Sequence, residues 1–217
     1  MSSGTADARA AGLPGVSPAA AGVIHPRWVR ITHWINVIAM FVMITSGWRI
    51  YDASPLFRFT FPPVITIGDG LDGLSGALLW HFAAMWLFVV NGITYVTLGI
   101  LSGRFRRKLL PIRPAEVVRD LHAALTGKLS HDDLSVYNAV QRLLYAGVIA
   151  AGIVIVLSGI SIWKPVQLQE FTAVFGGYNA ARFVHFFAMA AIVGFLLVHV
   201  TLAVLVPRSL RAMILGR

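Results

Sequence analysis

Four stretches of the chain are long, apolar and free of charged side chains. All Asp, Glu, Lys and Arg residues lie between or outside them, and the stretches are Ile31–Trp48, Leu74–Gly103, Leu143–Trp163 and Phe183–Val206. They lack the apolar–polar alternation of strands, and about 20 apolar residues suffice for a helix to cross a bilayer. The pattern predicts an all-α membrane protein, a four-helix transmembrane bundle of two hairpins with spans at about 31–50, 74–101, 141–163 and 182–206.

The composition agrees with this class. Of the 217 residues 57% are hydrophobic and only 12% are charged, and the mean hydropathy is +0.75. Soluble domains carry about 25% charged residues. The chain has no cysteine, which excludes disulfides, iron–sulfur clusters on thiolates and c-type haem attachment. A redox centre must therefore be held by histidine or be a diffusible cofactor.

The net charge of +9 is concentrated at three places. Arg27 and Arg30 precede the first span, seven basic against two acidic residues lie between Arg104 and Lys128, and three arginines follow the fourth span. The positive-inside rule then puts both termini and the central loop in the cytoplasm. The excess indicates the orientation of the chain in the membrane, with attraction to anionic lipid as a secondary role, and gives no reason to expect nucleic acid.

Two segments outside the spans have recognisable patterns. Residues 114–125 are expected to form an interfacial helix that starts at Pro114, or else a solvated connector. The loop 51–73 is rich in phenylalanine and proline, which suits either the membrane interface or a docking surface. Residues 1–24 lack a continuous apolar region, so we expect a disordered cytoplasmic tail rather than a secretory signal, followed by one domain over 25–217.

Four histidines lie within the spans at two depths. His185 and His199 are fourteen residues apart, which corresponds to about 21 Å along a helix and nearly the same face. Given the direction of each span, His81 matches the depth of His185 on the outer side, and His33 matches that of His199 on the inner side. One such histidine alone is most simply interpreted as an interfacial residue bonded to a carbonyl. Two matched pairs are what two haems with two imidazole ligands each would need.

The two hairpins contain a weak repeat. His81-Phe82-Ala83-Ala84-Met85 resembles His185-Phe186-Phe187-Ala188-Met189, and Thr45-Ser46-Gly47 resembles Leu157-Ser158-Gly159. This similarity indicates either chance or a duplication about an axis along the membrane normal, which would bring His81 and His185 face to face.

Other residues are candidates for supporting roles. Glycines spaced by seven allow close approach of either a macrocycle or a neighbouring helix: Gly92 and Gly99, Gly152 and Gly159. Cations near the span ends are expected to pair with haem propionates: Arg27 and Arg30 inside, Arg49, Lys164 and Arg182 outside. The remaining histidines, His25, His122 and His131, are expected to be exposed to solvent.

Asn138 and Gln141 open the third span on one helix face. Their amides are suited either to a quinone carbonyl or to capping of the helix. Their spacing alone favours the cap.

The chain resembles the bacterial di-haem cytochrome b membrane subunits of formate dehydrogenase, Ni-Fe hydrogenase and thiosulfate reductase. The resemblance runs from Pro26 to about Pro207 and rests on Arg30-Ile31-Thr32-His33-Trp34, Trp80-His81-Phe82, Tyr137-Asn138-x-x-Gln141-Arg142 and the His185/His199 pair. It implies the same pairing of haem ligands, a quinone site at Asn138 and Gln141, and electron transfer between an external catalytic subunit and the quinone pool. With its long outer loop, the chain is similar in form to cytochromes that accompany periplasmic molybdopterin oxidoreductases. Such an enzyme is therefore the expected partner, and the bacterial inner membrane is the expected location.

The function predicted is therefore that of a di-haem electron carrier between a periplasmic oxidoreductase and quinone, with a homodimer left open. The alternative is a stand-alone quinone-linked enzyme acting on a small oxidant or reductant such as superoxide, steered by Arg49, Arg58, Lys164 and Arg182. A metal-ion transporter is disfavoured because the spans contain no acidic residue.

Overall fold

Four long helices form the body of the protein. The structure, a computed structural model, describes residues 24–68, 74–126 and 137–216. Except for Ile24, the tail predicted for residues 1–24 lies outside the described residues, and so does His131. The long helices are α1 (Arg27–Ala53), α2 (Leu74–Leu101), α5 (Ala139–Trp163) and α7 (Tyr178–Leu205). Each is long and apolar enough to cross a membrane, so the predicted spans are confirmed, with ends displaced by a few residues.

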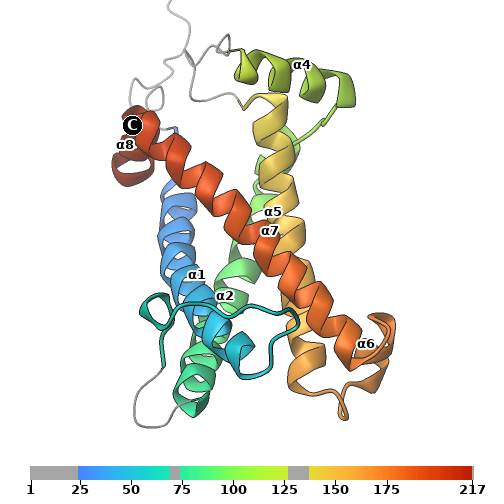
Figure 1. Cartoon of the computed structure of the whole chain (residues 1–217). Helices are drawn as coiled ribbons and strands as arrows, with labels where there is room; N and C mark the ends of the chain where they lie inside the picture. The colour runs from blue at the N-terminus through green and yellow to red at the C-terminus, as the bar shows by residue number, and fades with distance from the viewer. Residues whose placement is uncertain (1–23, 69–73, 127–136, 217) are drawn as a thin grey trace, which may run out of the picture.

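The helices pair as two hairpins, α1 with α2 and α5 with α7 (Figure 1). Small side chains such as Ala39, Ala77 and Ala181 are fully buried, and they allow the paired backbones to approach closely. In the first hairpin the Asn91 amide also donates to the Thr32 carbonyl (2.8 Å) and to Asn36 Oδ1 (2.6 Å). Extensive backbone packing occurs within each hairpin, whereas the contacts between hairpins are made mainly by aromatic and imidazole rings.

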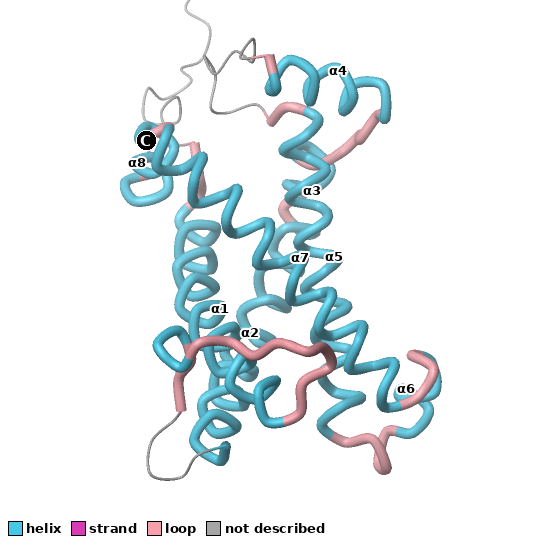
Figure 2. The backbone as a smooth tube through the Cα atoms, in the orientation of Figure 1, coloured by secondary structure: helices cyan, strands magenta, loops and turns pink. Residues whose placement is uncertain are grey.

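Among the described residues, five short helices lie at the two ends of the bundle, as can be followed in Figure 2. We call one end the α4 end; it carries α3 (Arg104–Lys108), α4 (Pro114–Leu125) and α8 (Pro207–Leu215). The other is the α6 end, with η2 (Pro63–Ile65) and α6 (Gln169–Val174). The helix expected at 114–125 is present, whereas α3, α6 and α8 were not predicted. Pro207 at the first turn of α8 was a signal for the last of these.

The loop after α1 folds across the α6 end toward α7 (Figure 2). The Phe57 ring lies 5.2 Å from that of Phe186, and Phe61 stacks on Trp48 at 4.8 Å between ring centres. The Ile67 N–H returns to the Thr45 carbonyl at 3.4 Å. Part of the aromatic content of this loop therefore serves to join the two hairpins, while Val64 at its tip stays 90% exposed.

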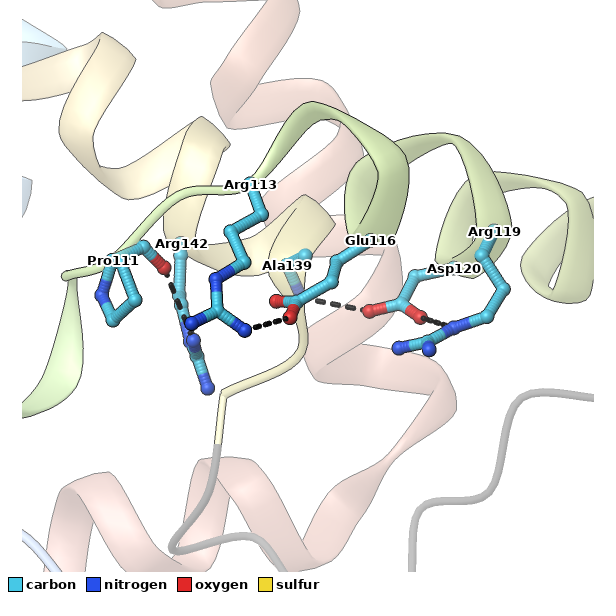
Figure 3. A network of polar contacts seen from close by, with 7 residues as sticks. All are labelled: Pro111, Arg113, Glu116, Arg119, Asp120, Ala139 and Arg142. Atoms are coloured by element: carbon cyan, nitrogen blue, oxygen red, sulfur yellow. Dashed lines mark hydrogen bonds and ion pairs between the residues drawn. The ribbon is translucent and has the colours of Figure 1, made fainter.

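At the α4 end, α4 is fastened to the first turn of α5 (Figure 3). Asp120 accepts a hydrogen bond from the Ala139 N–H (2.9 Å), and Arg142 donates to the Pro111 carbonyl (3.2 Å). Next to them, Asn138 and Gln141 form a reciprocal capping box, each side-chain oxygen accepting from the other residue's N–H (2.8 and 3.2 Å). Three main-chain N–H groups at the start of α5, those of Asn138, Ala139 and Gln141, thus have oxygen partners.

His25 corrects the expectation of solvent exposure. It is buried just before α1, and its Nδ1 lies 3.2 Å from the guanidinium of Arg104. Burial first, and then the Arg104 charge, lower the pKa of His25 to about 4, so the ring is neutral at pH 7. Sequence reasoning missed this because the burial is created by elements far away in the chain. His122, in contrast, is exposed as expected.

The C-terminal helix helps to close this end. The Arg30 guanidinium donates to the carbonyls of Met213 (3.2 Å) and Ile214, and the Ile24 N–H donates to the Gly216 carbonyl (3.0 Å). The segment before α1 and the end of α8 are therefore joined by main-chain and guanidinium hydrogen bonds.

The capping role of Asp120 is testable. We expect D120A to weaken the first turn of α5 by about 1 kcal/mol, the contribution of one hydrogen bond. Hydrogen exchange at the Ala139 amide should then accelerate about fivefold. The matched control is E116A, because the Glu116 carboxylate pairs with the exposed Arg113 in the first turn of α4 and, among the described residues, has no bond to α5. Equal exchange in the two variants would contradict the role assigned to Asp120.

Candidate functional site

Two of the four histidines in the spans, His81 on α2 and His185 on α7, belong to the α6 end. Each ring is held by the other helix of its own hairpin. Ser46 Oγ on α1 lies 3.0 Å from His81 Nδ1, and Ser158 Oγ on α5 lies 3.1 Å from His185 Nδ1. His81 and His185 thus lie on different hairpins, each supported by a serine in the same way.

A glycine next to each serine makes room for the ring. A Cβ added to Gly47 would lie 3.2 Å from His81 Cε1, and one added to Gly159 would lie 3.1 Å from His185 Cε1. Both distances are shorter than ordinary van der Waals contact. The Ser-Gly repeat seen in the sequence thus has a structural meaning, since both copies support a histidine of the same level in the same way.

The other two histidines, His33 on α1 and His199 on α7, face each other across the hairpins toward the α4 end. Their ring centres are 6.1 Å apart, with an angle of 56° between the ring planes. Phe195 stacks on His199 at 5.4 Å, and Tyr145 approaches it edge-on at 6.4 Å. Within the part of the chain that the structure describes, His33 Nδ1 is buried and has no hydrogen-bond partner.

This geometry suits a haem with two axial imidazoles. Metal–imidazole bonds are about 2 Å long, so two imidazoles on opposite sides of one metal have ring centres about 6 Å apart. The His33–His199 separation of 6.1 Å agrees with that value. At the other level, a neutral imidazole that donates from Nδ1 keeps Nε2 as the nitrogen able to bind a metal. The donor set, four histidines and no cysteine, fits b-type haem.

The cations predicted to pair with haem propionates lie at the expected ends of the bundle. Of these, Arg30, Arg182 and Lys164 already contact other groups of the chain. At the α4 end Arg30 holds α8, while Arg27 is exposed. At the α6 end Arg182 donates to the Ser54 carbonyl, and Lys164 lies 5.0 Å from the Trp163 ring centre. Arg49 is half-buried beside Trp48.

Further contacts concern glycines of the spans, the two residues that open α5, and Trp48. Gly159 contacts the histidine level, whereas Gly99 packs on the Phe105 ring. The side-chain oxygens of Asn138 and Gln141 accept hydrogen bonds in the capping box. The side-chain NH2 groups of the two residues take no part in that box and can donate to a ligand. The Trp48 indole N–H is buried without a partner among the described residues.

Sequence reasoning missed Ser46, Ser158 and Arg104 as residues next to the histidines. The two serines stood in the repeated Ser-Gly motif, which was the available signal. Arg104 gave none, because only the fold brings α3 next to His25.

Comparisons with known proteins identify the family of the chain. Residues 24–216 match the model of the family described as prokaryotic cytochrome b561. The chain is also 54% identical over 193 residues to a protein of Azospira oryzae named as a putative protein-methionine-sulfoxide reductase subunit, YedZ1, with 89% of this chain and 96% of that protein covered. The expected resemblance to bacterial b-type cytochrome membrane subunits is confirmed. The chain belongs to the prokaryotic cytochrome b561 family, whose members are multi-pass haem proteins of the bacterial inner membrane.

Proposed function

We propose that this cytochrome carries electrons between the quinone pool and a periplasmic oxidoreductase through two b-type haems. The observation that carries the proposal is the contact of His33 with His199 toward one end of the bundle, together with His81 and His185, each held by a serine, toward the other. His33 and His199 would hold one haem, and His81 and His185 would hold the other. Haem supplies one-electron redox chemistry at each level, while the chain supplies ligands and a medium of low dielectric constant.

The separation of the two levels supports a transmembrane path. Fourteen residues of α7 between His185 and His199 correspond to about 21 Å along the helix, most of a hydrocarbon core of about 30 Å. Both ligand pairs share α7, so one rigid helix fixes their spacing. We assign the α4 end to the cytoplasm, because it carries the basic clusters, and the α6 end to the periplasm.

Charged and polar groups near each level are suited to haem propionates. Arg49, Lys164 and Arg182 would serve the periplasmic side, where the Trp48 indole N–H offers a further donor. Arg27 and Arg30 would serve the cytoplasmic side. Arg30 would do so while it binds α8.

The quinone site proposed from the sequence lies at the start of α5. The capping box occupies the oxygens of Asn138 and Gln141 but not their N–H donors, which remain suitable for a quinone carbonyl. Tyr145, one turn further along α5, contacts His199 edge-on at 6.4 Å. A headgroup beside these residues would be close to the cytoplasmic haem and exchange protons with the cytoplasm.

The name of the Azospira relative suggests the substrate of the partner. We propose a periplasmic catalytic subunit, of the molybdopterin type expected from the sequence, that reduces methionine sulfoxide in proteins. That reaction consumes two electrons and two protons and yields methionine and water. Electrons would therefore pass outward from quinol in two one-electron transfers.

The haem content tests the ligand assignment. We expect two b-type haems per chain in the wild type and one in H199A, with the periplasmic haem still reducible from the outside and quinol turnover abolished. Pyridine haemochrome analysis and redox difference spectra measure both. H122A is the control, because His122 is exposed outside the spans, and it should keep two haems. Loss of both haems or of neither in H199A would refute the pairing.

The quinone role of Gln141 can be separated from its capping role. Q141E keeps an oxygen for the capping box but removes the N–H donor. We expect both haems to remain and the KM for quinol to rise about fivefold, the effect of one lost hydrogen bond of about 1 kcal/mol. Q141A, which also breaks the cap, serves for comparison. An unchanged KM in Q141E would restrict Gln141 to capping.

The partner is testable by purification. The tagged chain, solubilised from its native membrane under mild conditions, should co-purify with a periplasmic molybdopterin protein. The pair together, and neither alone, should reduce methionine sulfoxide in an oxidised protein with quinol as donor. Purification without a partner, combined with turnover of superoxide by the chain alone, would favour the stand-alone enzyme instead.

A further inference from the structure

The two histidine levels differ in what lies behind the rings. At the α6 end each imidazole Nδ1 faces a serine hydroxyl, at 3.0 Å for Ser46 and 3.1 Å for Ser158. Both serines are fully buried, with 0% of their surface exposed. Within the described residues, neither His33 nor His199 has a hydrogen bond of this kind, and His33 Nδ1 is buried without any partner.

The direction of the serine hydrogen bonds follows from their other contacts. The Ser46 hydroxyl donates to the Val42 carbonyl (2.5 Å), and the Ser158 hydroxyl donates to the Val154 carbonyl (2.8 Å). Each hydroxyl has only one proton, so its oxygen accepts from the imidazole. Nδ1 then carries the proton and Nε2 carries the free lone pair.

An N–H donated by a ligating imidazole has two known consequences. It fixes the tautomer and the ring orientation, and it raises the basicity of the nitrogen that binds the metal. A more basic ligand stabilises the oxidised, more positively charged metal over the reduced one. Hydrogen bonding behind an axial ligand is one of the means by which a protein sets a haem potential.

We propose that Ser46 and Ser158 are a matched pair of positioning residues that lock both axial imidazoles of the haem at the α6 end and make it the harder of the two haems to reduce. This inference rests on the ligand assignment of the proposed function. Its basis is the asymmetry between the levels, with two serine–imidazole hydrogen bonds at one and none at the other among the described residues.

The position of the serines explains why they act as a pair. They come from α1 and α5, the first helices of the two hairpins, and each is followed by the glycine that packs on the same imidazole. The two ligands of one haem are therefore supported in nearly the same way from both sides. Loss of either serine should have a similar effect, and loss of both a larger one.

The test is a redox titration of S46A, S158A and the double variant. The α6-end haem is assigned in an H199A background, where it should be the only haem left. We expect its midpoint potential to shift in the positive direction in each single variant and further in the double variant. The potential of the other haem should stay unchanged in the full protein. Electron paramagnetic resonance of the oxidised protein should also change for the α6-end haem, because the imidazole planes are no longer fixed.

Two matched controls come from the same helices. Thr45 and Ser161 are buried, and their hydroxyls donate to main-chain carbonyls of their own helix, Phe41 (2.8 Å) and Leu157 (3.0 Å). Among the described residues, neither hydroxyl has a hydrogen bond to a histidine. T45A and S161A should leave both potentials and both spectra unchanged. An equal shift in these controls, or a shift of the other haem, would overturn the proposal.

The remaining outcomes are also decisive. If the alanine variants keep two haems with unchanged potentials and spectra, the serines do not tune the haem and the inference fails while the proposed function stands. If S46A loses the α6-end haem, S46T restores the hydroxyl: recovery of the haem supports positioning, and continued loss rules it out. A wild-type protein without two haems would instead refute the proposed function itself.

Discussion

Burial of imidazole rings in hydrocarbon is the constraint on which the rest of the structure depends. A polar ring without a partner is costly in the interior of a membrane protein. The spans nevertheless contain four imidazole rings, so each ring needs a partner. Two of them have a serine hydroxyl as partner. The other two face each other at a separation suited to a shared metal. The four-helix frame can be understood as a means of holding these rings at two fixed levels.

The bundle is assembled from two similar hairpins rather than from four equivalent helices. Close backbone packing is confined mainly to α1 with α2 and α5 with α7, so each hairpin is a unit that carries its own Ser-Gly support for a histidine. The hairpins meet through rings: His33 with His199, Tyr51 with Phe186, and Phe82 with Trp163. A flat macrocycle between two hairpins would fit this division, because it needs ligands from opposite sides.

The ends of the bundle are closed by different means. At the α4 end, hydrogen bonds hold α4 to the start of α5 and α8 to the start of α1. At the α6 end, the loop after α1 packs its phenylalanines against α7. These closures keep α1 and α7 in register, and both helices carry one histidine of the pair toward the α4 end. The histidines proposed as haem ligands thus depend on segments that contribute no histidine to either level.

Local patterns in the sequence are enough to predict the class, the four spans and the depth of each histidine, because hydropathy and helical rise repeat every few residues. They also predict the helix at 114–125, the repeat containing Ser46 and Ser158, and the cap that Asn138 and Gln141 form at the start of α5, since that cap joins residues only three apart. The fold adds that these serines face imidazoles and that His25 is buried beside Arg104. Both facts depend on how separate helices are rotated against one another or on the path of the chain between elements, and local periodicity encodes neither.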